Sequence, residues 1–123
     1  MIFCPQVVMV ENNGRKRTFV TRLNGAEVTK INKWSDDGFI YYTATLPDRP
    51  GSRHFYRVRP DEDGPDSGPE CLSCGLKTEE FSDREDCTYF EASMSPDGSH
   101  YVLICKGPDI PYVCIHETGD KQR

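Results

Sequence analysis

Apolar and aromatic residues occur along this chain in short runs that turn-forming residues separate. The runs are rich in β-branched and aromatic side chains, which is typical of strands. Pro and Gly interrupt every window long enough for a helix. The runs expected to form strands are Gln6–Val10, Arg17–Thr21, Val28–Trp34, Phe39–Thr45, His54–Arg59, Tyr89–Met94, His100–Cys105 and Tyr112–His116. The pattern therefore predicts an all-β fold of antiparallel strands.

Two turns of similar sequence, Ser35-Asp36-Asp37-Gly38 and Ser95-Pro96-Asp97-Gly98, share Ser, Asp and Gly in register. Asp can accept backbone hydrogen bonds in such a turn, and Gly can adopt a positive φ. Each turn lies between two predicted strands, and a third predicted strand follows after a loop. A further turn at Glu11–Gly14 is expected to close an earlier hairpin. The order strand, turn, strand, loop, strand thus repeats.

Repeated antiparallel units are typical of β-propellers, in which each blade buries its faces against neighbouring blades. On this interpretation residues 1–24 are the end of one blade, residues 25–70 are a whole blade, and residues 71–123 are an incomplete blade. The alternative is a closed β-sandwich of about eight strands.

Composition narrows the possible functions. With 123 residues, of which 36% are hydrophobic, the chain has the size of one ordinary domain. A formal charge of −5 argues against a protein that binds nucleic-acid phosphates. No run approaches the ~20 apolar residues of a membrane span, and Met1–Val10 lacks the basic and apolar regions of a signal peptide. We therefore expect export or membrane anchoring to depend on a segment outside this sequence.

Six cysteines favour an oxidising compartment. The Ser95–Gly98 turn lies midway between Cys87 and Cys105, so we expect these two residues to face each other across a hairpin and form a disulfide. Cys4 and Cys114 are expected to be thiols without a catalytic role.

The Cys71-Leu-Ser-Cys74 segment allows three interpretations: a structural disulfide, a redox motif or half of a zinc site. A zinc ribbon needs a second close cysteine pair, and a thioredoxin-like motif needs a helix after the pair. Neither is indicated by the sequence, so the structural bridge is favoured.

The sequence gives only weak evidence for other catalytic or metal-binding sites. The three histidines lie in predicted strands or at their ends: His54, His100 and His116. Gly64–Gly68 places its serine one position too late for a nucleophile elbow. The acidic segments Asp61–Asp66 and Glu79–Asp86 lack the spacing of a calcium loop and are expected to be solvated. We therefore predict no catalytic, metal-binding or cofactor-binding residue.

Several segments together resemble one family in order and spacing. They are Thr18–Thr21, Glu27-Val28, Ile40–Tyr42, Arg53–Tyr56, Cys71–Cys74, Cys87–Ser95, Cys105-Lys-Gly-Pro and Pro111 to His116. Over about residues 17–118 the chain is similar to the N-terminal β-propeller of dipeptidyl peptidase IV and its relatives. The cysteine framework with its Cys-x-Gly-Pro end is the most specific part of this likeness.

The resemblance implies an eight-bladed propeller that caps an α/β-hydrolase domain. Such a parent is a homodimeric, type II membrane or secreted serine exopeptidase that acts outside the cell and removes X-Pro dipeptides from peptide substrates without a cofactor. This chain resembles the late blades only, so no catalytic residue is carried over. The disulfide pairs Cys71–Cys74 and Cys87–Cys105 are carried over.

Two functional classes remain open within the family. In the first, the parent is an active dipeptidase and this segment builds part of the propeller wall that gates substrate access. In the second, the parent is an inactive homologue that acts as a partner of membrane proteins. A third class outside the family is a secreted, disulfide-rich binding domain.

Overall fold

The computed structural model describes residues 6–10, 17–19, 27–46, 49–60, 68–74, 87–107 and 111–119. All regular secondary structure in these segments is β, which confirms the predicted fold class. The strands are β1 (Val8–Val10), β2 (Arg17–Phe19), β3 (Val28–Trp34), β4 (Ile40–Leu46), β5 (Arg49–Val58), β6 (Glu70–Cys71), β7 (Tyr89–Met94), β8 (His100–Gly107) and β9 (Tyr112–Glu117). The turn expected at Glu11–Gly14, the two acidic segments and Cys4 lie outside the described residues.

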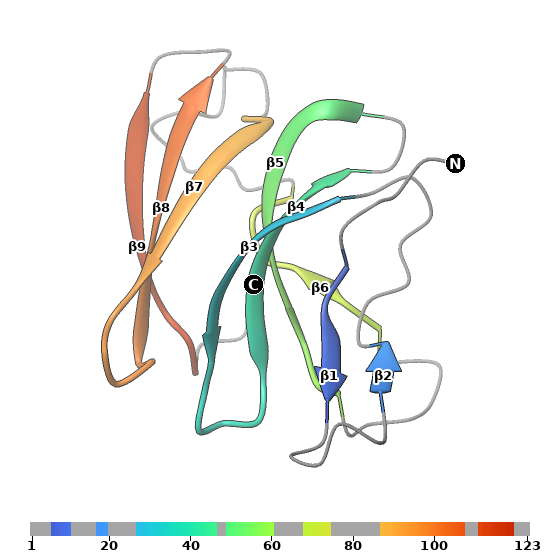
Figure 1. Cartoon of the computed structure of the whole chain (residues 1–123). Helices are drawn as coiled ribbons and strands as arrows, with labels where there is room; N and C mark the ends of the chain where they lie inside the picture. Colours follow the sequence, from blue (N-terminus) through green and yellow to red (C-terminus); the bar gives the residue numbers. More distant parts are fainter. Residues whose placement is uncertain are drawn as a thin grey trace.

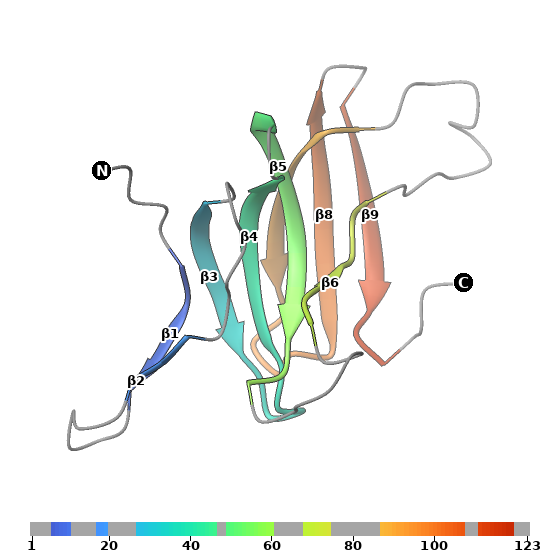
Figure 2. The same ribbon diagram turned by 90° about the vertical axis from the view of Figure 1, so that its right-hand side faces the viewer.

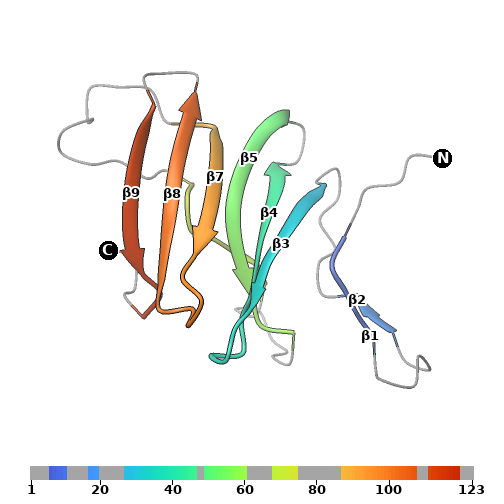
Figure 3. The same cartoon turned by 60° about the vertical axis from the view of Figure 1, so that its left-hand side comes forward.

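The strands form two antiparallel units and a separate hairpin. One unit has the order β3-β4-β5, with β6 on the outer side of β5, and the other has the order β7-β8-β9. A single parallel register pair, Arg53↔Tyr89, joins them. The hairpin β1–β2 lies on the other side of the β3–β6 unit (Figure 1). Three successive units therefore lie side by side (Figure 3), which is how propeller blades are arranged.

The central strand of the middle unit, β4, is buried on both faces. Every residue of β4 except the last is buried, so neither face of this strand meets solvent. The core between the β3–β6 and β7–β9 units contains Tyr41, Phe55, Leu72, Cys87, Phe90, Ala92, Tyr101, Leu103 and Cys105. The opposite face holds a second core of Val7, Ile40, Tyr42, Ala44, Tyr56 and Val58. A strand buried on both sides has the continuous apolar and aromatic sequence seen here.

Both predicted turns are confirmed. Gly38 has a φ of 89° and Gly98 a φ of 75°. The Asp37 and Asp97 carboxylates accept backbone hydrogen bonds from residues two positions later, at 2.9 and 3.0 Å. At Asp97 the hydrogen bonds from Ser99 and Ser95 lower the pKa of the carboxyl well below its usual range. The repeated sequence therefore encodes a repeated turn geometry.

Several strand ends differ from the sequence prediction by one or two residues, and the start of β5 differs by more. β5 begins at Arg49 rather than His54, because the Ser52 hydroxyl accepts a hydrogen bond from Leu46 N–H and donates one to the Arg49 carbonyl. β5 runs antiparallel beside β4 (Figure 2). β6 was not predicted, since it has only two residues and gains its partners from β5.

The register predicted for the last hairpin is wrong. Cys105 pairs with Phe90, and Cys87 precedes β7 instead of facing Cys105. The chain reverses through a longer loop than the four-residue turn, since Ser95 N–H donates to the His100 carbonyl at 3.0 Å. The register also shifts between Tyr89 and Phe90. The midpoint of the hairpin therefore lies closer to the C-terminus than the sequence predicted.

Candidate functional site

Polar contacts join the two large units. Asn32 in β3 donates its side-chain amide to the Ala92 carbonyl in β7 at 3.1 Å, and its oxygen accepts from the Thr43 hydroxyl at 3.0 Å. The Lys33 ammonium donates to the Pro96 carbonyl at 2.9 Å. These contacts hold β3 against β7 at a fixed separation. Asn is uncommon in strands, and that is the one sequence signal that could have indicated a special role for Asn32.

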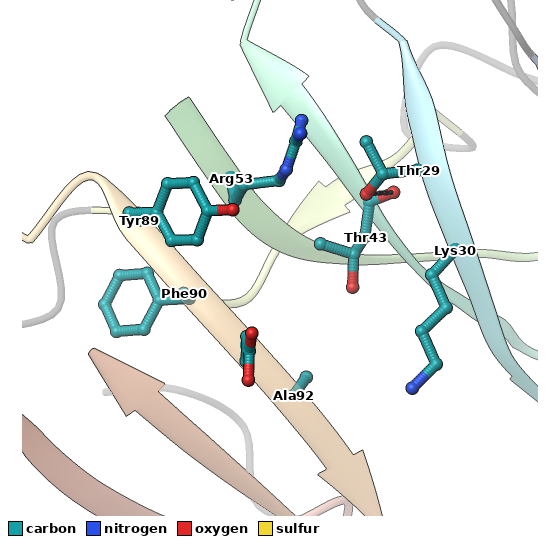
Figure 4. A pocket seen from close by; sticks show the side chains of 8 residues that line it. Thr29, Lys30, Thr43, Arg53, Tyr89, Phe90 and Ala92 are labelled. Atoms are coloured by element: carbon teal, nitrogen blue, oxygen red, sulfur yellow. Dashed lines mark hydrogen bonds between the residues drawn. The ribbon is translucent and has the colours of Figure 1, made fainter. Parts of the chain in front are cut away.

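An open cleft of about 310 Å³ lies between the same two strands. Figure 4 shows Thr29, Lys30 and Thr43 on one side and Tyr89, Phe90 and Ala92 on the other. The Arg53 guanidinium lies over the Tyr89 ring, 5.6 Å from its centroid. Glu91 is paired with Lys106 at 2.8 Å. The lining of the cleft thus combines hydroxyl, aromatic and oppositely charged side chains.

The other end of the interface is held by Arg57. Its Nε pairs with Glu70 at 2.7 Å, its Nη1 donates to the Thr118 carbonyl at 3.3 Å, and its guanidinium lies over the Phe39 ring at 4.3 Å. Burial tends to lower the pKa of this guanidinium, but hydrogen bonds to Glu70 and Tyr41 raise it overall. Arg57 therefore stays charged and links β5, β6 and the end of β9.

The Cys71–Cys74 segment forms a disulfide with a Cα–Cα distance of 5.6 Å. Ser73, between these residues, is fully buried. Its hydroxyl accepts from the Phe55 N–H at 2.9 Å and is hydrogen-bonded to Nδ1 of His54 at 2.8 Å. Burial lowers the pKa of His54. The bridge thus lies beside the buried pair Ser73 and His54 against β5, with Cys74 exposed to solvent.

Cys87 and Cys105 also form a disulfide, with a Cα–Cα distance of 6.1 Å. Both residues are buried in the core between the two units. Since Cys105 pairs with Phe90 in the ladder, this bond reaches diagonally from β8 to Cys87, two residues before β7 begins. It fixes the path by which the chain enters the second unit.

Two serine–histidine side-chain contacts occur among the described residues, and neither has the arrangement of a hydrolase triad. In a triad the carboxylate orients the histidine, and the serine donates to the histidine and is open to substrate. Ser73 is only 1% exposed. The exposed Ser99 contacts Nδ1 of His100 at 2.8 Å, but its hydroxyl donates to Asp97, and the Glu117 carboxylate lies 3.8 Å from Nε2 of His100, too far for a hydrogen bond. These pairs are structural.

The remaining predicted residues lie in β9. Burial raises the pKa of the Cys114 thiol, which keeps the thiol protonated and poorly nucleophilic near neutral pH. The His116 ring stacks on Tyr101 with centroids 5.2 Å apart. Among the described residues Cys114 is the free cysteine.

Antiparallel units stacked face to face, with the central strand of the middle one buried on both sides, define neighbouring blades of a β-propeller. The sequence matches the family "Dipeptidyl peptidase IV (DPP IV) N-terminal region" over residues 4–112. This chain belongs to that family.

Curated relatives agree with the assignment. The chain is 45% identical to venom dipeptidyl peptidase 4 of Vespa velutina over 85 residues, which are 69% of this chain and 10% of that protein. It is 30% identical to dipeptidyl peptidase 4 of Felis catus over 106 residues, 85% of this chain and 12% of the relative. It is 45% identical to inactive dipeptidyl peptidase 10 of Rattus norvegicus over 51 residues, 42% of this chain and 6% of the relative.

The chain thus spans about one tenth of the length of the relatives it matches. It is a segment of the propeller region that these proteins share. Within the described residues no helix is long and apolar enough to span a lipid bilayer.

Proposed function

We propose that this chain forms part of the propeller wall of a longer, dipeptidyl peptidase IV-like serine exopeptidase. The parent would remove X-Pro dipeptides from the N-termini of peptides. The segment would line the route of the substrate and carry out no bond cleavage itself. The observation that carries the proposal is the face-to-face packing of two blades, held by Asn32 against Ala92, in a chain with dipeptidyl peptidase relatives.

The cleft between β3 and β7 supports this role. Its hydroxyl and charged groups offer transient partners to a peptide backbone, and its open shape does not enclose a ligand. A wall of this kind suits passage of substrate better than tight binding. Two disulfides and the secreted venom relatives favour an extracellular parent, either secreted or anchored through another segment. We further propose that the parent is a homodimer.

The pairing of the strands also supports a proposal about which residues belong to each blade. We propose that residues 1–24 end one blade, that a whole blade follows from residue 25, and that an incomplete blade makes up the rest of the chain. Because β6 pairs with β5, the whole blade includes Glu70 and Cys71 as its short outer strand. The boundary between the two blades then falls after the Cys71–Cys74 turn.

A second candidate is an inactive dipeptidyl peptidase-like protein that acts by binding a partner. The chain is 45% identical to inactive dipeptidyl peptidase 10 over 51 residues, and this similarity favours the second candidate. Propeller blades serve both classes equally well, so the distinction depends on the catalytic serine of the parent.

The test is an assay of the longer polypeptide that contains this chain. Purified from the medium of secreting cells, it should release the dipeptide from an X-Pro chromogenic substrate, and a serine-directed inhibitor should abolish the signal. A matched control carries Ala in place of the serine of its G-x-S-x-G motif. A folded polypeptide without activity would refute the enzymatic proposal and favour the inactive class.

A further inference from the structure

Three potential metal ligands from two neighbouring strands meet at the Cys71–Cys74 bridge. A ring nitrogen of His54 and the sulfurs of Cys71 and Cys74 all lie within 4.8 Å of one another. His54 belongs to β5. Cys71 is the last residue of β6, and its Cα pairs with that of Tyr56 in β5. The ladder pairing of Cys71 and the hydrogen bonds of Leu72 and Ser73 to Phe55 hold this segment against β5 independently of the disulfide.

We propose that reduction of the Cys71–Cys74 disulfide converts this cluster into a site for Zn²⁺ or a similar thiophilic divalent ion, with His54, Cys71 and Cys74 as ligands. The Cys-x-x-Cys spacing is that of structural zinc sites, which also use histidine. A tetrahedral ion with Zn–S bonds of about 2.3 Å would hold the two sulfurs about 3.8 Å apart. Cleavage of the S–S bond allows that separation.

The redox step is a thiol–disulfide exchange with a dithiol reductant. One thiolate of the reductant attacks Sγ of Cys74, the S–S bond breaks, and Cys71 leaves as a thiolate. The second thiol of the reductant resolves the mixed disulfide, so the reductant is oxidised to a disulfide and the two cysteines are reduced. Binding of the metal ion then releases the cysteine thiol protons to solvent.

Exposure makes this reduction selective. Cys74 is exposed, whereas Cys87 and Cys105 are 4% and 0% exposed. Since exchange requires access to a sulfur, the Cys71–Cys74 bond reacts before the buried one. The open side at Cys74 also gives an ion an entry path, and the fourth position of a tetrahedral ion could hold a water molecule.

The surroundings of His54 suit a ligand. Its ring is buried and tilted against Phe90 at 5.7 Å between centroids, so its orientation is fixed. Ser73 contacts the same ring and can orient it as an outer hydrogen-bond partner.

The experiment is a Co²⁺ titration of the full chain in a Cys4→Ser, Cys114→Ser background, which removes the other two thiols. The dithiol concentration is set so that peptide mapping shows Cys71–Cys74 reduced and Cys87–Cys105 intact. The reduced chain should bind one Co²⁺ with a sulfur-to-cobalt charge-transfer band, and the oxidised chain should show none. Equal spectra in both states, or no band after reduction, would overturn the proposal.

The ligand role of His54 is tested with His54→Gln, and His116→Gln is the control on a half-buried histidine that also packs on an aromatic ring. We expect at least a tenfold loss of Co²⁺ affinity for His54→Gln and less than a twofold change for the control. Equal losses in both variants would contradict the assignment. Should His54→Gln fail to fold, Zn²⁺ should still slow alkylation of Cys71 and Cys74 in the reduced background chain, and unchanged rates would refute the site.

Discussion

Asn32 and Ala92, sixty positions apart, are joined by a side-chain amide to carbonyl hydrogen bond of 3.1 Å that connects two propeller blades. The same Asn32 accepts from Thr43 within its own blade. This residue therefore couples the internal order of one sheet to the position of the next.

Replacing Asn32 with Asp should weaken the contact between the blades. The variant keeps an oxygen for the Thr43 hydroxyl, but it has no amide donor and brings a carboxylate toward the Ala92 carbonyl. We expect a loss of about 1–2 kcal/mol in the free energy of unfolding, measured by urea denaturation. Asn32→Gln, which retains both groups on a longer stem, is the control. An unchanged midpoint for Asn32→Asp would show that the hydrogen bond contributes nothing.

The two repeated glycines differ in their surroundings, and Ala substitutions should reveal the difference. Both have a positive φ, which costs about 1 kcal/mol for a residue with a Cβ. A Cβ at Gly98 would also lie 2.6 Å from the Ser35 hydroxyl oxygen, whereas a Cβ at Gly38 meets nothing within 4 Å. Gly98→Ala should therefore lower the melting temperature more than Gly38→Ala. Equal shifts would mean that Ser35 moves aside without cost.

The two disulfides should differ in their effect on stability. The Cys87–Cys105 bond closes a sequence separation of 18, and the Cys71–Cys74 bond closes a separation of 3. Loop-closure entropy assigns about 3 kcal/mol to the first and about 2 kcal/mol to the second. Cys105 is also buried in the core. Cys105→Ser in the longer polypeptide should thus reduce secretion more than Cys74→Ser, as measured by blotting the medium. The opposite order would contradict this ranking.

The outer face of the β7–β9 unit should make the isolated chain self-associate. Val113 and Ile115 are 61% and 71% exposed on β9, as expected for a blade face without its neighbour. Sedimentation velocity should show oligomers or aggregates. The double variant Val113→Lys, Ile115→Lys should shift the chain toward monomer, whereas Lys substitutions at the exposed Glu91 and Glu117 should not. A monomeric unmodified chain with a sharp two-state melt would count against the blade interpretation.

The sequence predicted much of this fold because hairpins are encoded locally. The Asp and Gly of each turn set the reversal, and the flanking apolar residues set the strands, so Val28–Trp34 and Tyr89–Met94 were predicted with their observed bounds. Tertiary pairing decided the rest. The strand Glu70–Cys71 exists only because β5 offers an edge, and the reversal around the Ser95–Gly98 turn sets a register in which Cys105 faces Phe90 rather than Cys87.

The sequence also did not predict that His54 lies close to Cys71 and Cys74. Sequence spacing indicated an isolated cysteine pair, and the third side chain is supplied by pairing across β5 and β6. The inter-blade contact of Asn32 depends on the position of a neighbouring sheet, which no local pattern specifies.

We propose above all that this segment forms part of the propeller wall and does not itself cleave a peptide bond. The most direct test is an assay of the isolated chain against an X-Pro chromogenic substrate. The chain should give no turnover above a buffer blank, because the serine–histidine contacts of the described residues are a buried pair, Ser73 with His54, and an exposed pair in which Ser99 donates to Asp97. Turnover that a serine-directed inhibitor abolishes would contradict the account.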